Sequence, residues 1–343
     1  MTAITAGRLP VRMLKPSITA PAAVFFLFAI IVASLLQGPA NLGLGEVVAG
    51  IMGTGDEVTN TIVRELRIPR LLLSLLVGAI LAGAGAALQG YLRNPLAEPA
   101  ILGASNAAAL GAVIALHMGV ASASIYIMPL AAGACTVISM ALLLAFSVRS
   151  TSTLTLVLTG IAISSLAGAG ISLVLNMSTN PFAAMEIAFW LLGSVEDRSM
   201  QHVIIAAPLI AIGMALLMWN ARALDALSLG EDSAQSLGFN MNWVRARLIL
   251  GVSLGVGAAV SVAGAIGFVG LVAPHIARGL GYTAPSRVML PAALIGATLV
   301  TAADILVRVL ETTNELKLGV VTAVIGGPFL ILILRRTRPR SFG

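Results

Sequence analysis

The chain has 343 residues, of which 58% are hydrophobic and only 10% are charged, and its mean hydropathy is +1.01. A soluble domain has about a quarter of its residues charged, so this composition excludes a water-facing globular protein and requires a bilayer around most side chains. The net charge of +6 is not accompanied by a basic patch interleaved with aromatic residues, and no nucleic-acid partner is expected.

Small residues are abundant, with 35 glycines and many alanines. Because small residues let helices approach closely in lipid, this composition favours an all-α polytopic membrane protein. A membrane β-barrel would show short segments of alternating polarity, and none appears in the sequence. The single cysteine, Cys135, lies in an apolar run and gives no support for a disulfide or a metal cluster.

Nine apolar segments are each long enough to span the hydrocarbon core of a bilayer. They are residues 20–37, 70–90, 100–119, 124–148, 153–176, 202–220, 244–265, 287–309 and 318–335. The first follows Arg8, Arg12 and Lys15, as the apolar part of a signal peptide would. No convincing small-x-small cleavage site follows it, so the sequence predicts a first membrane helix.

A tenth, weaker segment covers residues 268–280 and contains Pro274, His275 and Arg278. It is either a re-entrant piece or a short helix buried among the others. Charge favours ten crossings, because an inside N-terminus then leaves only six of the 20 basic residues outside, as the positive-inside rule expects. The six are Arg64, Arg67, Arg70, Arg198, Arg308 and Lys317.

With ten crossings, residues 38–69 and 177–200 form outside loops, and Asn180-Pro181 breaks the helix in the second loop. Trp190 in that loop is interpreted as an interfacial anchor. The cytoplasmic parts are the N-terminal segment 1–19, the loop 221–243 and the tail 336–343. No linker or low-complexity tract marks a second domain, so residues 1–343 are expected to form one membrane domain.

The inside loop after the second span reads Arg93-Asn94-Pro95-Leu96-Ala97-Glu98-Pro99. Its two prolines fix a turn and bar helix continuation, and the side chain of Asn94 can bond backbone groups in a turn. The pattern is compatible with a simple polar connector and with a functional loop, and spacing alone does not separate the two.

The inside segment from Leu229 to Phe239 predicts a short surface helix between Gly230 and Gly238. Glu231 and Asp232 fall in its first turn, where the helix dipole favours anions. Apolar residues near its ends need a partner, which is either lipid or a docked protein. Its acidic residues argue against an anionic leaflet and favour a docked protein.

The third pattern, Gly264 to Arg278, has glycines at positions 264, 267 and 270, which would share one face if the segment were helical. The one histidine of this segment, His275, is interpreted as structural rather than as a metal or haem ligand. A fourth feature is Asp304, an acidic residue inside an apolar span. It either pairs with Arg308 one helical turn later or serves in a proton relay.

Catalytic signatures are lacking from the polar loops. There is no G-x-x-x-x-G-K-[ST], H-E-x-x-H or C-x-x-C motif, and the one match to G-x-S-x-G, Gly251 to Gly255, lies inside the apolar segment 244–265. With no plausible set of nucleophile, base and oxyanion donor, an enzyme is not expected. A secondary transporter is the main alternative from another class, but it would need ionisable sites within the membrane, and Asp304 is the only acidic residue well inside a span.

From about residue 60 to the C-terminus, the sequence resembles the FecCD-type permeases, the membrane subunits of ABC importers for iron-siderophores, haem and cobalamin. The resemblance rests on several motifs taken together. They are Arg67-Ile68-Pro69-Arg70, Gln89-Gly90 with Arg93 to Pro99, Leu229 to Gly238, Gly264 to Arg278, Ala303-Asp304, Glu315 to Thr322, and Gly326-Gly327-Pro328.

The resemblance implies a ten-helix, cobalamin-permease-like subunit of a type II importer in a bacterial inner membrane, with both termini cytoplasmic. It implies a second permease copy, two cytoplasmic ATPase subunits and a periplasmic binding protein as partners. No cofactor is expected on this chain, and ATP with Mg²⁺ would be bound by the ATPase. An iron chelate is the expected cargo, with cobalamin as the alternative, and alternating access is the implied mechanism.

The resemblance also implies roles for particular residues. Arg67, Arg70 and Arg308 would contact the binding protein, in agreement with their position outside the membrane. The ATPase-coupling set would be Leu229, Gly230, Glu231, Ala234, Leu237 and Gly238. The cytoplasmic gate would comprise Asn94, Thr153 and Leu154, although the sequence around the last two diverges from the family. Lys317 also departs from the family, which usually has proline there.

Overall fold

The computed structural model describes residues 16–147, 153–310 and 316–337. Arg8, Arg12, Lys15, Glu315 and the end of the predicted tail lie outside the described residues. All ten predicted segments contain a helix, and no strand occurs in the described ranges. These helices are α1 (Pro16–Leu36), α4 (Ile68–Leu92), α5 (Ala104–His117), α6 (Ile127–Ser147), α7 (Thr153–Met177), α9 (Met200–Trp219), α12 (Met241–Ala263), α13 (Val269–Gly279), α14 (Pro285–Val309) and α15 (Leu318–Thr337).

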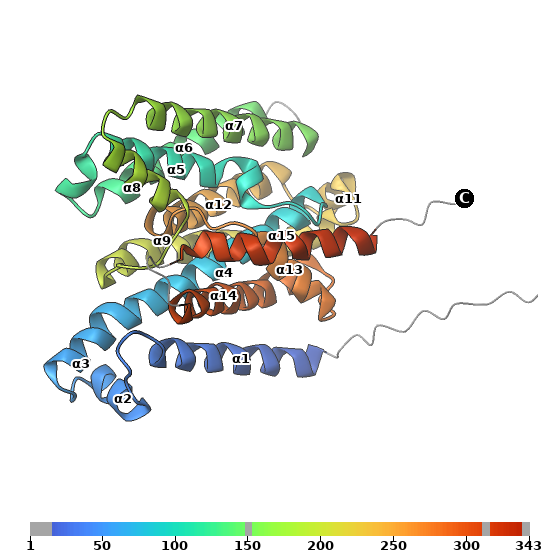
Figure 1. The fold of residues 1–343 in the computed structure, drawn as a ribbon. Coiled ribbons are helices and arrows are strands. Elements are labelled where there is room, and N and C mark those ends of the chain that lie inside the picture. The colour runs from blue at the N-terminus through green and yellow to red at the C-terminus, as the bar shows by residue number, and fades with distance from the viewer. Residues whose placement is uncertain (1–15, 148–152, 311–315, 338–343) are drawn as a thin grey trace, which may run out of the picture.

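Five helical stretches in the described part of the chain are long and apolar enough to cross a membrane. They are Glu57–Leu92, Val157–Met177, Met200–Trp219, Met241–Ala263 and Pro285–Val309. The stretches within α4 and α12 are the most buried, because these two helices lie in the middle of the bundle (Figure 1). α1 and α7 lie at opposite edges of the view.

The predicted outside loop 38–69 contains more structure than its sequence indicated. It holds α2 (Leu44–Met52), α3 (Glu57–Thr61) and a π-helical stretch, η1 (Ile62–Arg67), which runs directly into α4. Pro69 has no N–H group and its ring would clash with the carbonyl of Glu65 in a regular α-helix. The wider π turn just before Pro69 accommodates the proline without ending the helix.

Two further predicted loops also contain helices. The outside loop 177–200 contains α8 (Pro181–Leu191), whose N-cap Asn180 accepts the Phe182 N–H at 3.0 Å, so the predicted break at Asn180-Pro181 is confirmed. Trp190 is partly buried against the core, and its indole N–H has no hydrogen-bond partner among the described residues. Its role as an interfacial anchor stays a prediction. The inside loop 221–243 contains α10 (Ala221–Leu227) and α11 (Glu231–Ser236).

Two short 3-10 helices explain why the predicted segments 100–119 and 124–148 begin too early. Pro99–Leu102 forms η2, and Gly103, at φ 80°, turns the chain before α5 begins. Val120–Ala123 forms η3 ahead of α6. Left-handed backbone of this kind favours glycine and interrupts a helix whatever the hydropathy of its neighbours.

The tenth segment is a short helix buried among the others, so that alternative is confirmed over a re-entrant loop. α12 ends at Ala263, residues 264–267 are not helical, and α13 then covers about 16 Å, or half of the hydrocarbon core. Gly264, Gly267 and Gly270 therefore do not share one helix face. His275 packs edge-on against Phe329 with 5.9 Å between ring centroids, in agreement with its structural interpretation.

Close backbone contacts hold the central helices together. A Cβ added at Gly78 of α4 would lie 2.2 Å from the Gly296 carbonyl oxygen of α14, and one at Gly296 would lie 2.3 Å from the Gly78 oxygen. α4 and α14 are thus in backbone contact at these two glycines, with only the methyl group of Ala82 beside them, as small residues permit in lipid.

The two ends of the bundle differ. Figure 1 shows that the start of α1, α11 and the end of α15 lie at one end, whereas α2 and α3 lie at the other. The first of these is called the α11 end below, and the second is called the α2 end.

Candidate coupling, gating and docking sites

The short helix α11 is bounded by two glycines with positive φ, Gly230 at 115° and Gly238 at 88°. Within α11, Ala234 is fully buried against the bundle. Leu229 and Leu237, which flank the helix, are 72% and 62% exposed. Two large apolar side chains at the end of a membrane bundle are left without an intramolecular partner. The structure therefore brings together the residues that the sequence assigned to ATPase coupling, and it leaves their apolar surface open.

The segment that contains α11 is firmly attached to the bundle. The carboxylate of Asp225 in α10 accepts the N–H and the O–H of Ser286, the second residue of α14, at 2.9 Å and 2.5 Å. Buried Arg245 of α12 donates to the Tyr91 hydroxyl at the end of α4, with 3.0 Å between Nε and Oη. A force applied to α11 would thus reach α14, α12 and α4. Sequence analysis missed Asp225, because a single carboxylate in a polar loop carries no pattern.

The predicted gate residue Asn94 lies in an exposed turn. Its Oδ1 accepts the Leu96 N–H at 3.0 Å, and its carbonyl accepts the Ala97 N–H at 3.1 Å. We call residues 94–103 the gate loop. The turn begins at Arg93, which adopts left-handed backbone at φ 49°, a conformation that few residues other than glycine take.

The other two predicted gate residues, Thr153 and Leu154, begin α7, and the side chain of Leu154 is exposed. The gate loop meets α7 farther along the helix, where Ser164 Oγ donates to the Ala100 carbonyl at 3.2 Å. This contact lies about three helical turns along α7 from Thr153 and Leu154, whereas the hydrogen bonds of Asn94 described above lie within its own turn.

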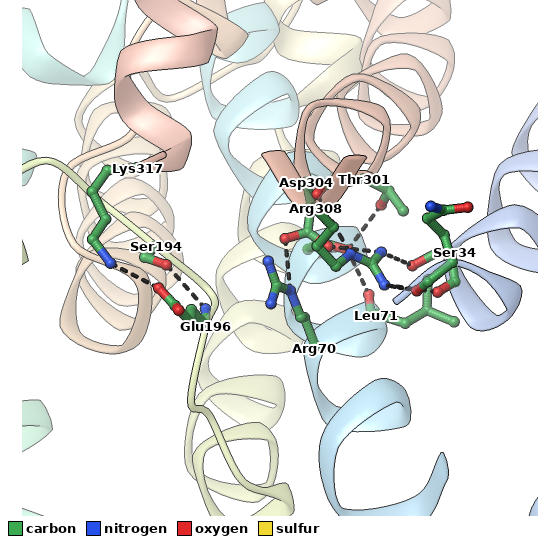
Figure 2. Close-up of polar contacts among 11 residues, drawn as sticks. Ser34, Arg70, Leu71, Ser194, Glu196, Thr301, Asp304, Arg308 and Lys317 are labelled. Carbon is green, nitrogen blue, oxygen red and sulfur yellow. Dashed lines mark hydrogen bonds and ion pairs between the residues drawn. The ribbon is translucent and has the colours of Figure 1, made fainter. Parts of the chain in front are cut away.

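At the α2 end, Arg70 and Arg308 converge on the carboxylate of Asp304 (Figure 2). Arg70 Nε lies 2.9 Å from Asp304 Oδ1, and Arg308 Nη2 lies 3.0 Å from Oδ2. The carboxylate is 1% exposed and Arg70 is 16% exposed. The alternatives for Asp304 are thereby decided in favour of pairing, with two arginines rather than one.

The predicted docking arginines also hold the end of α1. Arg308 donates to Ser34 Oγ at 2.8 Å and to the carbonyls of Ser34 and Gln37. Buried Arg67 donates to the carbonyls of Leu35, Leu36 and Ala40. The last carbonyls of a helix have no intrahelical donors and carry partial negative charge, so they attract these guanidinium groups. In this structure the three arginines are therefore committed to internal partners.

Lys317 forms a separate ion pair at the start of α15. Its Nζ lies 2.7 Å from Glu196 Oε2 in the loop after α8 (Figure 2). Beside it, the Gly319 N–H bonds the Leu192 carbonyl at 3.0 Å. The residue that departs from the family pattern thus fastens α15 to the loop between α8 and α9.

Comparison with known proteins matches most of the chain to one family. The model of the FecCD transport family matches residues 26–336. The cobalamin import system permease protein of Halobacterium salinarum is 39% identical, over 83% of this chain and 76% of its own length. The Fe(3+)-citrate import system permease protein of Bacillus subtilis is 35% identical, over 90% of this chain and 92% of its own length.

A solved structure has a very similar fold. It is described as an inward-facing conformation of a putative metal-chelate type ABC transporter, and it superposes with a TM-score of 0.84 at 29% identity. The match covers 93% of this chain and 99% of that one.

Proposed function

This chain is an ABC importer permease that belongs to the FecCD transport family, and we propose that it carries an iron chelate, a siderophore complex or haem, across the plasma membrane by alternating access. The observation on which this depends is the exposed pair Leu229 and Leu237 around α11, at the end of the bundle where a soluble motor can reach it. The chain itself does no chemistry, and ATP is hydrolysed with Mg²⁺ in a partner.

The assembly we propose has two copies of this chain, two ATPase subunits and an extracytoplasmic binding protein. The ATPases dock on Leu229, Gly230, Glu231, Ala234, Leu237 and Gly238, and the α11 end with both termini faces the cytosol. Because the family match covers most of the chain, we propose that residues 1–343 act as one permease domain. Asn94, Thr153 and Leu154 form the cytoplasmic gate.

The cargo assignment is supported by two similar proteins. The Fe(3+)-citrate permease matches along nearly its whole length, and the similar solved structure is described as metal-chelate type. The permease of Halobacterium salinarum, described as a cobalamin importer, is as similar in sequence, so cobalamin is the second candidate. A path for either bulky cargo can be lined with small and apolar residues.

Reconstitution with the ATPase subunits in liposomes tests the proposal. We expect uptake of radiolabelled ferric citrate or a ferric siderophore that requires ATP and the binding protein. Uptake of cobalamin but not of any ferric chelate would favour the second candidate. Uptake without the ATPase would contradict an ATP-driven importer.

Docking of the binding protein on Arg67, Arg70 and Arg308 is tested best at Arg70, the most exposed guanidinium of the Asp304 ion pairs. We expect Arg70→Glu to weaken binding-protein affinity at least tenfold while the dimer still assembles, because charge reversal replaces attraction with repulsion. Arg67→Glu would disturb the end of α1, and Arg70→Glu would place a second carboxylate beside Asp304. The thermal stability of both variants must therefore be measured alongside the affinity. Unchanged affinity for Arg70→Glu would argue against this docking site.

A further inference from the structure

Glu98, in the middle of the gate loop, bonds a helix far away in sequence. Its Oε1 accepts the Phe268 N–H at 2.7 Å, immediately before α13 begins. Phe268 has left-handed backbone at φ 67°, which turns the chain into the helix. The first N–H groups of a helix have no intrahelical partner, and a carboxylate there is favoured by the helix dipole. Glu98 therefore caps α13 from another part of the chain.

A second residue joins the same three elements. Gln89 is buried in the last turn of α4, and its Nε2 donates to the Ala97 carbonyl of the gate loop and to the Gly270 carbonyl of α13, both at 3.2 Å. Its Oε1 accepts Arg278, near the other end of α13. The gate loop is thus bonded to α13 at Ala97 through Gln89 and directly at Glu98.

Packing leaves little room for these elements to slide past one another. A Cβ added at Gly85 of α4 would lie 1.9 Å from the Gly270 carbonyl oxygen, and one at Gly270 would lie 3.0 Å from Pro99 Cδ of the gate loop. The gate loop, the start of α13 and the middle of α4 therefore touch through backbone and proline atoms. Because so little space is left between these elements, a shift of α13 must either carry the gate loop with it or break these contacts.

The environment of Glu98 is not that of a simple surface connector. Burial raises the pKa of its carboxyl group, and the Phe268 N–H only partly opposes that effect. None of the ion pairs found among the described residues includes Glu98. Holding a carboxylate in a partly buried position without an ion-pair partner costs free energy, which a solvent-facing turn would not require.

The opposite end of α13 leads to the segment with α10 and α11. After Gly279 a short turn reaches the start of α14, where Asp225 of α10 holds Ser286 through two hydrogen bonds. One continuous set of contacts therefore runs from α10 through the start of α14 and α13 to Glu98. Spatial continuity alone does not establish coupling, so an experiment on the gate itself is required.

We propose that Glu98 is a positioning residue that fastens the gate loop to α13, so that the gate follows α13 when the ATPase displaces the α10–α11 segment. This inference rests on the proposed function, because it needs a motor at α11 and a gate at Asn94. Without the Glu98 contact, the ATPase hydrolyses ATP but the gate no longer responds.

The test uses Asn94→Cys as a gate reporter in a Cys135→Ala background, in the full complex with its ATPase. The rate of disulfide cross-linking between the two copies is measured without nucleotide and after trapping with ATP, Mg²⁺ and vanadate. We expect a rate that depends on nucleotide. In Glu98→Ala and Glu98→Asp, the ratio of the two rates should fall to one while ATP hydrolysis persists.

Glu98→Gln keeps an acceptor oxygen at the same distance, so it should restore the nucleotide response. The matched control is Ser164→Ala, which removes the bond from the same loop to α7 and should leave the response intact. A preserved response in both Glu98→Ala and Glu98→Asp would overturn the inference but leave the gate in place. If the parent Asn94→Cys protein itself shows no response, the proposed gate fails instead.

If Glu98→Ala does not assemble, the comparison of Glu98→Asp with Glu98→Gln decides alone. Loss of the response in Glu98→Gln as well as in Glu98→Asp would show that the hydrogen bond to Phe268 is not the relevant contact, and the proposal would be wrong.

Discussion

Asp304 shows how one buried carboxylate organises an end of the bundle. It neutralises only one of the two arginines that reach it, and the second charge is distributed over the carbonyls at the end of α1. The cluster joins α1, α4 and α14, three elements that are distant in sequence. It also sets the orientation of the guanidinium groups that we propose for docking.

Asp304→Asn removes the buried carboxylate that Arg70 and Arg308 share. Because removing one partner of a buried ion pair leaves an uncompensated charge, we expect a loss of about 3–5 kcal/mol in the free energy of unfolding. Equilibrium unfolding in detergent measures this free energy. The control is Asp232→Asn at an exposed position, for which we expect a change within about 0.5 kcal/mol. Equal stability of the two variants would show that the cluster is not structural.

The Lys317–Glu196 pair is more exposed, with side chains 23% and 26% accessible, so solvent screens it. A double-mutant cycle with Lys317→Met and Glu196→Gln should give a coupling of about 0.2–1 kcal/mol, as for other surface pairs. The coupling should decrease at high salt. A coupling of zero at low salt would mean that Lys317 does not fasten α15 through this contact.

At the scale of elements, the central crossing of α4 and α14 depends on the absence of side chains. The backbones of Gly78 and Gly296 occupy the space that a Cβ would need. By contrast, an added Cβ at Gly133 in α6 or Gly168 in α7 would meet nothing within 4 Å. The same residue type therefore has opposite consequences on different helices.

Gly78→Ala should destabilise the bundle by about 1–3 kcal/mol, because the new methyl group forces two packed backbones apart. Gly133→Ala and Gly168→Ala should be neutral or stabilising by up to about 1 kcal/mol, since alanine favours the helix. Thermal unfolding of the three variants in one detergent compares them. The prediction fails if Gly78→Ala melts no lower than the two controls.

At the scale of the whole molecule, the two ends of the bundle differ in the groups that gather there. The exposed Leu229 and Leu237 lie at the α11 end, and the largely buried arginine cluster and the Lys317 pair lie at the α2 end. This separation suits a protein that receives energy on one side and cargo on the other.

The orientation of these ends can be tested by accessibility labelling in a Cys135→Ala background. We expect Asp232→Cys to react with an impermeant maleimide only from the cytosolic side, and Glu57→Cys only from the outer side, because basic residues concentrate in the loops of the α11 end. Glu57 and Asp232 are both exposed in the structure. Labelling of both from one side would imply an even number of crossings between them and would exclude the proposed topology, which has five.

The sequence by itself determined the membrane class, the ten helical segments and the short helix α11. These follow from local properties, namely apolar length, proline and glycine breaks, and the distribution of arginines. The prediction of α11 between Gly230 and Gly238 succeeded because both glycines adopt positive φ, which few other residues tolerate.

The tertiary structure alone decided which polar groups meet. Asp304 with Arg70, Asp225 with Ser286, Glu98 with Phe268 and Lys317 with Glu196 are joined across 61 to 234 residues. No periodicity links such positions, because their proximity depends on how helices cross rather than on the properties of either segment. The helices within the loops 38–69 and 177–200 escaped prediction for a related reason: in a membrane bundle, short helices are stabilised by packing more than by their own sequence.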